Sequence, residues 1–458
     1  MSETKKPISP ITIGAGCLIL GGAIGGLAGH CATKSALSSD NGSSVTVASA
    51  SGNAFVAPAV FVPGWMAERT FHNDAILCPW TENPLNDTDC QFRQSEINRI
   101  RNAISLCPNP LARNMETIGH RGAALVAPEE TIRSWQIAVD SGAAIVECDA
   151  SVTKDLDFMC RHGTCDLQFT TDILTRPDMV AKCSQPFAPA GNGTRASVLC
   201  CTFDFTVEEM GKLCATMENV VNDQATRIEE YVIGKPAFRS IGFAKGECVQ
   251  MATMREYLAF AKSKAVNVIP ELKDTTENAT QVFLAKNNKD HVWLADKFAS
   301  YLRDAGFTTP FDKDFKEKGK KGTIGIMQTF DRRVAKAWKQ NNKDLSVLYL
   351  LETPMNITST EKDCATPADC GSPDVLRDLI KAGVEIISPA MNGFVDADPA
   401  THRYVEHQYS KDMKAIVKEL NATDRTFFGS WSLERSGCVS QLGNATYNAE
   451  AGLGSIGG

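Results

Sequence analysis

The sequence has no excess of positive charge, and so its composition gives no case for a protein that binds nucleic acid. Its 458 residues include 47 lysines and arginines against 54 aspartates and glutamates, a formal net charge of −7 at pH 7. The cysteines show no Cys-x-x-Cys spacing with partner histidines, which argues against zinc. No glycine-rich dinucleotide fingerprint follows the first strand-like run, which weakens the case for an open nucleotide-binding sheet.

Cysteine is plentiful instead, with 16 residues in a chain of globular composition, 43% hydrophobic and 22% charged. So many cysteines fit disulfides in an oxidising compartment better than a cytosolic enzyme. Seven Asn-x-Ser/Thr triplets support translocation, because each is a potential glycosylation site in the secretory pathway. They begin at Asn41, Asn86, Asn192, Asn278, Asn356, Asn421 and Asn444.

The N-terminus also indicates translocation. Lys5 and Lys6 precede residues 11–29, an uncharged run long enough to span a bilayer. Lysines on this side favour a cytoplasmic location for residues 1–10. A cleaved signal peptide is the alternative, although its apolar region is usually shorter. We therefore expect a membrane-anchored protein with an extracellular or lumenal main domain, or a secreted one.

The rest of the chain divides into an extension and a main domain. Residues 30–112 are expected to form a flexible stalk followed by a disulfide-tied extension. The main domain is assigned to residues 113–458, with a cysteine-rich insert at 172–247. The oligomeric state cannot be inferred.

Strand-like and helix-like runs alternate through the main domain. The strands are expected at 116–119, 144–149, 266–272, 323–328, 346–351, 385–388 and 426–429. The helices are expected at 130–141, 251–264, 292–305, 332–341, 374–382 and 411–419. This alternation predicts an α/β fold with a parallel sheet, and polar motifs at the strand ends favour a TIM-type (β/α)₈ barrel.

The eighth strand of this barrel is missing from the pattern. Residues 434–458 are rich in Gly, Ser, Asn and Ala and contain no convincing β-branched run. A barrel without its last strand leaves unpaired edges on the first and seventh strands. We therefore expect a C-terminally incomplete sequence, or a barrel that is open or closed in an unusual way.

Charged residues gather at the predicted strand ends. The first strand ends in His120 and Arg121, followed by a glycine that permits a sharp turn. Glu147 and Asp149 are two residues apart on the second strand and thus share a face. Two adjacent carboxylates repel unless a cation lies between them, and a hard divalent cation is the simple solution. Isolated, this Glu-x-Asp pair would more often be two exposed acids.

The third strand and the preceding loop add to this set. Glu271 and Lys273 share a face at the end of the third strand, where the acid suits a metal and the amine an anion. His162 lies between Cys160 and Cys165, and a bridge between these cysteines would fix its loop. Two histidines, three carboxylates, an arginine and a lysine together fit metal-assisted acid–base chemistry on an anionic phosphate ester.

Seven motifs in order resemble the glycerophosphodiester phosphodiesterase family. They are His-Arg-Gly at 120–122, Pro-Glu-Glu-Thr at 128–131, Glu-Cys-Asp at 147–149, His162, Pro-Glu-Leu-Lys at 270–273, Gln-Thr-Phe-Asp at 328–331 and Trp-Ser-Leu-Glu-Arg-Ser-Gly at 431–437. The last resembles secreted eukaryotic members. Glu130 stands where the family usually has asparagine, which puts only a supporting contact in doubt.

The resemblance implies a role for each of these residues. Glu147, Asp149 and Glu271 would bind one divalent cation, Ca²⁺ or Mg²⁺. His120 would be the general base and His162 the general acid. Arg121 and Lys273 would hold the phosphate, Glu129 would orient Arg121, and Trp431 would line the substrate pocket.

The implied activity is metal-dependent hydrolysis of glycerophosphodiesters to glycerol 3-phosphate and an alcohol. Whether water or the substrate's own hydroxyl attacks is open. One alternative is a phospholipase D-like or C-like barrel that acts on intact lipid. Another is a non-catalytic surface glycoprotein, for which loss of a ligand or histidine is expected; all are present.

Overall fold

The computed structural model describes residues 113–124, 127–234, 248–351, 371–390, 395–398, 403–423 and 425–429. The predicted segments 1–10, 11–29 and 30–112, and Trp431, lie outside these residues. Among the described residues, no helix is long and apolar enough to cross a membrane.

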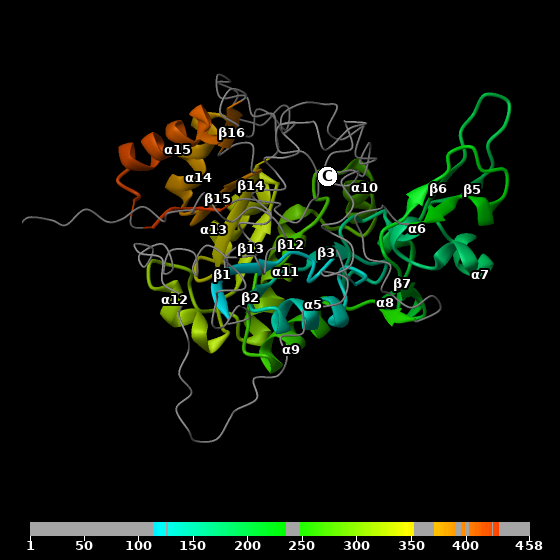
Figure 1. Ribbon diagram of the computed structural model, residues 1–458, viewed down its shortest axis with the longest axis horizontal. Helices are drawn as coiled ribbons and strands as arrows, with labels where there is room; N and C mark the ends of the chain where they lie inside the picture. Colours follow the sequence, from blue (N-terminus) through cyan, green and yellow to red (C-terminus); the bar gives the residue numbers. More distant parts are fainter. Residues whose placement is uncertain are drawn as a thin grey trace, which may run out of the picture.

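Parallel strands occupy seven successive positions of a curved sheet in sequence order (Figure 1). They are β1 (Asn114–Gly119), β2 (Ala143–Val146) continued by β3 (Asp149–Val152), β11 (Asn267–Val268) continued by β12 (Glu271–Leu272), β13 (Ile326–Thr329), β14 (Ser346–Leu351), β15 (Ile386–Pro389) and β18 (Phe427–Phe428). Every pairing between neighbouring positions is parallel. All seven predicted strands are therefore confirmed.

The sheet is not closed into a full barrel by the described residues. In this part of the chain β1 pairs only with β2, and β18 pairs only with β15. Seven positions form, and no described strand bridges the gap between β1 and β18. Residues 434–458, in which the sequence predicts no convincing eighth strand, lie outside the described residues.

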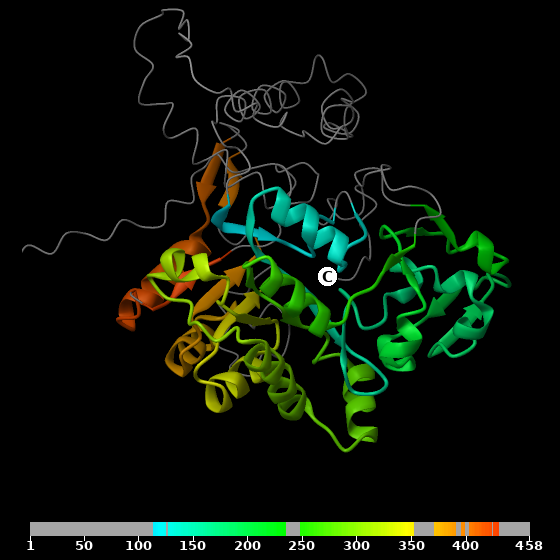
Figure 2. The same cartoon turned by 90° about the horizontal axis from the view of Figure 1, so that it is seen from below.

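Helices follow the strands and cover the outer face of the sheet (Figures 1 and 2). The longer ones are α5 (Ile132–Asp140), α9 (Met254–Ser263), α10 (Asn278–Lys286), α11 (His291–Ala305), α13 (Arg332–Asn341), α14 (Pro373–Ala382) and α15 (Gln408–Glu419). Side chains of Thr131, Thr253 and Ser372 accept hydrogen bonds from backbone N–H groups in the first turns of α5, α9 and α14. The six predicted helices are confirmed, with ends shifted by up to three residues.

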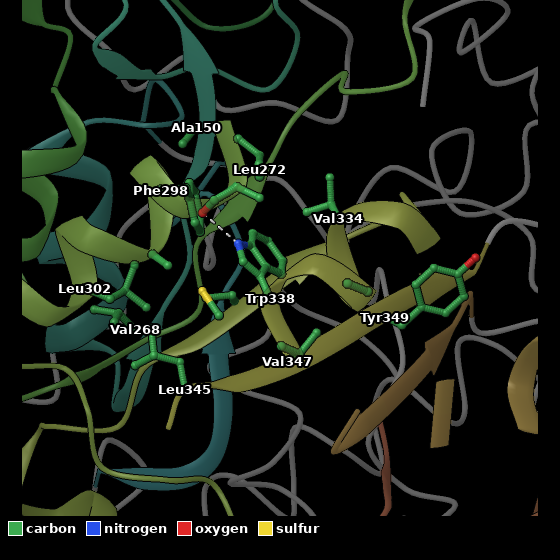
Figure 3. Close-up of a cluster of buried hydrophobic side chains, with 14 of the residues drawn as sticks. Ala150, Val268, Leu272, Phe298, Leu302, Val334, Trp338, Leu345, Val347 and Tyr349 are labelled. Atoms are coloured by element: carbon green, nitrogen blue, oxygen red, sulfur yellow. Dashed lines mark hydrogen bonds between the residues drawn. The ribbon is translucent and has the colours of Figure 1, made fainter. Parts of the chain in front are cut away.

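The outer core lies between the sheet and these helices (Figure 3). Its centre is Trp338 of α13, whose indole Nε1 donates to the carbonyl of Ala295 at 2.8 Å. An inner core of strand side chains fills the barrel, including Ile145, Ile269 and Ile326. Because side chains alternate along a strand, the chain that points Ile145 inward also points Glu147 and Asp149 inward.

The insert forms a lobe beside the barrel (Figure 2). Its short elements are α6 (Leu167–Thr170), α7 (Pro177–Val180), α8 (Val207–Met210) and the antiparallel pairs β5 (Gln185–Ala188) with β6 (Ser197–Leu199), β7 (Cys214–Ala215) with β10 (Val249–Gln250), and β8 (Val220–Val221) with β9 (Val232–Gly234). Leu167, Ile173 and Leu213 belong to a separate apolar cluster in this lobe. The insert therefore has its own small core.

The remaining elements are peripheral to this plan. They are β4 (Phe158–Cys160), which pairs antiparallel with β3, the hairpin of β16 (Val395–Asp398) and β17 (Arg403–Glu406), α12 (Phe315–Lys318), and the 3₁₀ turns Ile173–Thr175, Thr202–Asp204, Ile228–Glu230 and Gly319–Lys321. Of these, β4 matters most for function, because His162 follows it directly.

Candidate active site

The turn after β1 brings Arg121 into the barrel mouth. Gly122 donates to the carbonyl of Gly119 at 3.0 Å, and its φ of +82° belongs to the left-handed region that favours glycine. A side chain at Gly122 would collide with Ser134 at the start of α5. The Ser134 hydroxyl donates to the Arg121 carbonyl at 3.0 Å and so holds the turn. The predicted sharp turn is confirmed.

Glu147 lies where the second strand is interrupted between β2 and β3. The indole of Trp135 donates to its backbone carbonyl at 2.8 Å, which fixes the interruption against α5. Its carboxylate accepts a bond from the backbone N–H of Arg121 at 2.5 Å and another from Gln328 at 3.2 Å. The predicted shared face of Glu147 and Asp149 is confirmed, and both are buried. The structure thereby links the first, second and fourth barrel strands at one carboxylate.

Asp149 is the centre of a buried ionic cluster. Its Oδ2 is 3.2 Å from Nε of Arg121, and its Oδ1 is 3.8 Å from Nζ of Lys273. Glu271 is paired with Asp149 across β12 and β3, and its Oε1 is 3.0 Å from the same lysine nitrogen. Burial opposes ionisation of Asp149, but Lys273, His162 and Arg121 outweigh it and hold the pKa of Asp149 below its usual range. Asp149 is therefore a carboxylate at neutral pH.

The two predicted histidines both lie near this carboxylate. His120 follows β1 and His162 follows β4, and both are partly exposed. Both imidazoles contribute to the lowering of the pKa of Asp149, which places them around one group. Burial, Arg121 and Lys273 in turn lower the pKa of His162 well below its ordinary value. When no anion is bound, burial and these two cations therefore disfavour the imidazolium form of His162.

The predicted Cys160–Cys165 bridge is wrong. Cys160 is instead joined to Cys148, which forms a disulfide between β4 and the second barrel strand. Cys165 is joined to Cys201 in the insert. Both bonds still restrain the loop that carries His162, through partners that are 12 and 36 residues away in sequence. Together with Cys183–Cys200 and Cys214–Cys248, they are typical of an extracellular or secreted protein.

Glu129 lies beside Arg121, the residue that it is predicted to orient. Its Oε1 is 3.4 Å from NH1 of Arg121, and its backbone carbonyl accepts a bond from buried Arg161 at 2.7 Å. Trp431 lies outside the described residues, so its predicted place in the pocket, and the likeness of its stretch to secreted eukaryotic members, stay predictions.

Glu130 lies closer to the centre of the site than the sequence predicts, where it was expected to affect only a supporting contact. Its side chain is fully buried, and its Oε1 accepts the backbone N–H of Asp149 at 3.2 Å. Glu130, Glu147 and Asp149 each have a carboxylate oxygen within 4.8 Å of the others. In the sequence, the only sign that this residue is unusual is that the family usually has asparagine here. The sequence does not show that the side chain is buried.

This acidic cluster fits a hard divalent cation. Three carboxylates converge, and Oε2 of Glu130 and both carboxylate oxygens of Asp149 have no hydrogen-bond partner. Glu271, the third predicted ligand, lies beside Asp149 but is held by Lys273 and is not part of this tightest group. A second group, formed by Glu130 with Cys148 and Cys160, offers no thiolate, because its two sulfur atoms are bonded to each other.

A parallel β/α barrel with a buried charged cluster at the carboxyl ends of its strands is the class that this structure defines. The sequence profile of the glycerophosphoryl diester phosphodiesterase family matches residues 120–387, which is more than half of the chain. The chain belongs to this family, and the recognition made from seven motifs is confirmed.

Individual relatives agree with this assignment. The chain is 25% identical over 192 residues to glycerophosphodiester phosphodiesterase GDPD6 of Arabidopsis thaliana, covering 42% of this chain and 44% of that protein. It is 23% identical over 299 residues to GDPDL6 of the same plant, covering 62% of this chain and 36% of that protein. The match thus spans less than half the length of these curated relatives.

Among solved structures, a phosphodiesterase of Oleispira antarctica in complex with the product sn-glycerol-3-phosphate aligns with a TM-score of 0.37. The alignment has 13% identity and covers 68% of this chain and 91% of that one.

Proposed function

We propose that this protein hydrolyses glycerophosphodiesters to glycerol 3-phosphate and an alcohol. The observation that carries the proposal is the environment of Asp149. Two buried cations contact this carboxylate, two histidines lie near it, and two further acids are its neighbours. All of these groups lie at strand ends within or beside the region that matches the family. A phosphodiester needs charge neutralisation, a base and an acid, and this site has each of them.

Arg121 and Lys273 bind the phosphate in this proposal. Both side chains are buried, and in the structure both form ion pairs with Asp149. Glu129 and the backbone contacts of the turn hold the Arg121 guanidinium in the mouth. The Lys273 ammonium nitrogen lies 5.8 Å from the centre of the Phe330 ring. Two cations held in this way supply the fixed positive field that stabilises charge developing on the phosphoryl oxygens.

His120 and His162 serve as base and acid respectively. The acid must be protonated when the substrate is bound, yet Arg121 and Lys273 lower the pKa of His162 in the free protein. A phosphate between these cations offsets their charge and raises the pKa of His162 again. Substrate binding therefore prepares the acid, and His162 donates its proton to the departing alkoxide.

Glu147, Asp149 and Glu271 are the residues that would hold Ca²⁺ or Mg²⁺. A cation in this position supplies Lewis-acid polarisation of a phosphoryl oxygen. The carboxylates themselves place negative charge opposite Arg121 and Lys273, so that the site stays organised when no substrate is bound.

The test is an assay of the purified protein on glycerophosphocholine, with and without EDTA, and then with added Ca²⁺ or Mg²⁺. We expect release of choline and glycerol 3-phosphate, loss of activity on chelation and recovery with metal. Phosphatidylcholine is the matched lipid substrate. Cleavage of the intact lipid but not of glycerophosphocholine would favour the phospholipase alternative, and full activity in EDTA would remove the cation.

The proposed location is the secretory pathway, with residues 11–29 as anchor or signal. Three of the glycosylation triplets lie in the described structure, and Asn192, Asn278 and Asn421 are all exposed. Expression in a eukaryotic secretory pathway should give a product that loses mass on glycosidase treatment. Carbonate extraction then separates an integral anchor from a cleaved signal.

A further inference from the structure

Glu130 carries two structural costs that its neighbours do not explain. Its φ of +60° lies in the left-handed region, where a residue other than glycine or asparagine is strained. Its carboxyl group is also fully buried, with one oxygen lacking a hydrogen-bond partner. An asparagine would suit this backbone better and would bury no charge. Backbone strain and an unpaired buried carboxyl oxygen at the same residue point to a function.

The buried charges of the site indicate what that function is. Among the described residues, the buried charges at and around Asp149 include five acids, Glu129, Glu130, Glu147, Asp149 and Glu271, and three cations, Arg121, Arg161 and Lys273. Asp331, also buried, is paired with Arg333 and is left out of this set. Fully ionised, this set has two negative charges in excess. Buried charges of one sign are stable only when a counter-charge is near. One divalent cation removes the whole excess, and without the carboxylate of Glu130 the same cation would leave the site positive.

The geometry places Glu130 where such a cation would bind. One of its carboxylate oxygens lies within 4.8 Å of oxygens from both Glu147 and Asp149. Its Oε1 is oriented by the backbone N–H of Asp149, while Oε2 has no hydrogen-bond partner. Glu271, by contrast, has Lys273 at 3.0 Å. Glu130 is therefore better placed to give an oxygen to a cation than the acid predicted from the third strand.

We infer that Glu130 is a ligand of the divalent cation, which adds a carboxylate to the predicted set of Glu147, Asp149 and Glu271. The inference rests on the cation of the proposed function and goes beyond it by assigning a ligand at a position where the family resemblance predicts asparagine. More anionic ligands bind a hard cation more tightly, so Glu130 raises the affinity of this site.

The experiment is a titration of the full chain with CaCl₂ and with MgCl₂ by calorimetry, without substrate. Glu130→Gln keeps the shape of the side chain and removes its charge. Glu277→Gln is the control, because Glu277 is exposed before α10. We expect Glu130→Gln to weaken cation binding by at least roughly 10- to 100-fold, the loss seen when even a supporting partner of a ligand is removed. The control should bind like the wild type.

Glu130→Asn gives a second readout, thermal unfolding. In EDTA this variant should be as stable as the wild type or more so, because asparagine adopts this left-handed backbone conformation more readily than glutamate does. Added cation should raise its melting temperature less than that of the wild type.

The outcomes separate this inference from the proposed function. If the wild type binds the cation and both Glu130 variants bind it with the same affinity, Glu130 is not a ligand, although the cation site itself remains. Failure of both variants to fold would also overturn it, because it would show a purely structural role. No cation binding by the wild type would overturn the inference and the cation requirement together, while hydrolysis in EDTA would decide the activity separately.

Discussion

The barrel and the insert hold their structures by different means. The barrel has two apolar layers, one inside the sheet and one beneath the helices, and most of its large side chains are fully buried there. The insert has one small apolar cluster, short strands, and two disulfides of its own. Helix and strand periodicity is therefore enough to specify the barrel, whereas the insert depends on covalent cross-links.

The difference also concerns function. Every described charged residue that we assign to the site lies on or directly after a barrel strand or β4, or in the segment between β1 and α5. The described part of the insert supports the site through Cys201, which is bonded to the loop after His162, and through Thr202, whose backbone N–H donates to the Thr164 carbonyl at 2.7 Å. The four predictions below test this division of labour.

The largest effect is expected at the two histidines. His120→Ala and His162→Ala should each lower kcat/KM by about 10²- to 10⁴-fold, the usual contribution of general acid–base catalysis. Both side chains are partly exposed, so the melting temperature should change little. His291→Ala, at the start of α11, is the matched control on the outer face of the barrel. Near-normal activity in either variant would remove that histidine from the chemistry.

The second effect concerns the two cores. Trp338→Ala should cost about 3–5 kcal/mol in the free energy of unfolding, because it leaves a large cavity under the helices. Leu213→Ala in the insert should instead open that lobe locally. Hydrogen exchange by mass spectrometry distinguishes these results. Loss of protection throughout the barrel in the Leu213 variant would show that the two cores unfold as one.

Most of the barrel could be predicted because its signals are long and periodic. Each predicted strand and helix is present, since burial on both faces of a parallel strand leaves a continuous apolar run. The interruptions at Glu147–Cys148 and at Ile269–Pro270 were not predicted. The first depends on Trp135 and the turn after β1, which are distant in sequence, and the second includes a proline, which has no N–H to donate.

The site was predicted less evenly, for a physical reason. Strand-end residues such as Glu147 and Lys273 could be grouped because parallel strands bring their carboxyl ends together. Disulfide pairing depends on distances in space, which the sequence does not give. The predicted partner of Cys160 was therefore wrong: it is bonded to Cys148. Glu130 was undervalued because its burial against Asp149 comes from the turn at Arg121, whose carbonyl accepts the Glu130 N–H at 3.3 Å.

The third effect separates two disulfides. The pair Cys165→Ala and Cys201→Ala, and the pair Cys183→Ala and Cys200→Ala, should each cost about 3–4 kcal/mol by the loop-closure argument. Of these two double variants, only the first should also lower kcat. The Cys165–Cys201 bond restrains the loop after His162, whereas the Cys183–Cys200 bond does not reach it. Activity and thermal unfolding are measured on both double variants. Equal activity in the two would mean that backbone contacts alone position His162.

The smallest effect concerns Asp166, which lies where the barrel chain enters the insert. Burial raises the pKa of Asp166 to about 7, against the opposing charge of Arg161. Between the ordinary carboxyl pKa and pH 7, the folded state therefore keeps a proton that the unfolded chain has lost. Its contribution to stability is fully present below the ordinary pKa and is lost as the pH rises through about 7.

Asp166→Asn removes this proton and keeps an oxygen that can accept the N–H of Gly163, now bonded at 3.1 Å. The melting temperature of the variant relative to the wild type should therefore rise between pH 4 and pH 7.5 and then level off. Melting curves at several pH values measure this difference. Parallel curves at all pH values would show that Asp166 titrates normally, and that the junction between the barrel and the insert is no less solvated than an ordinary surface.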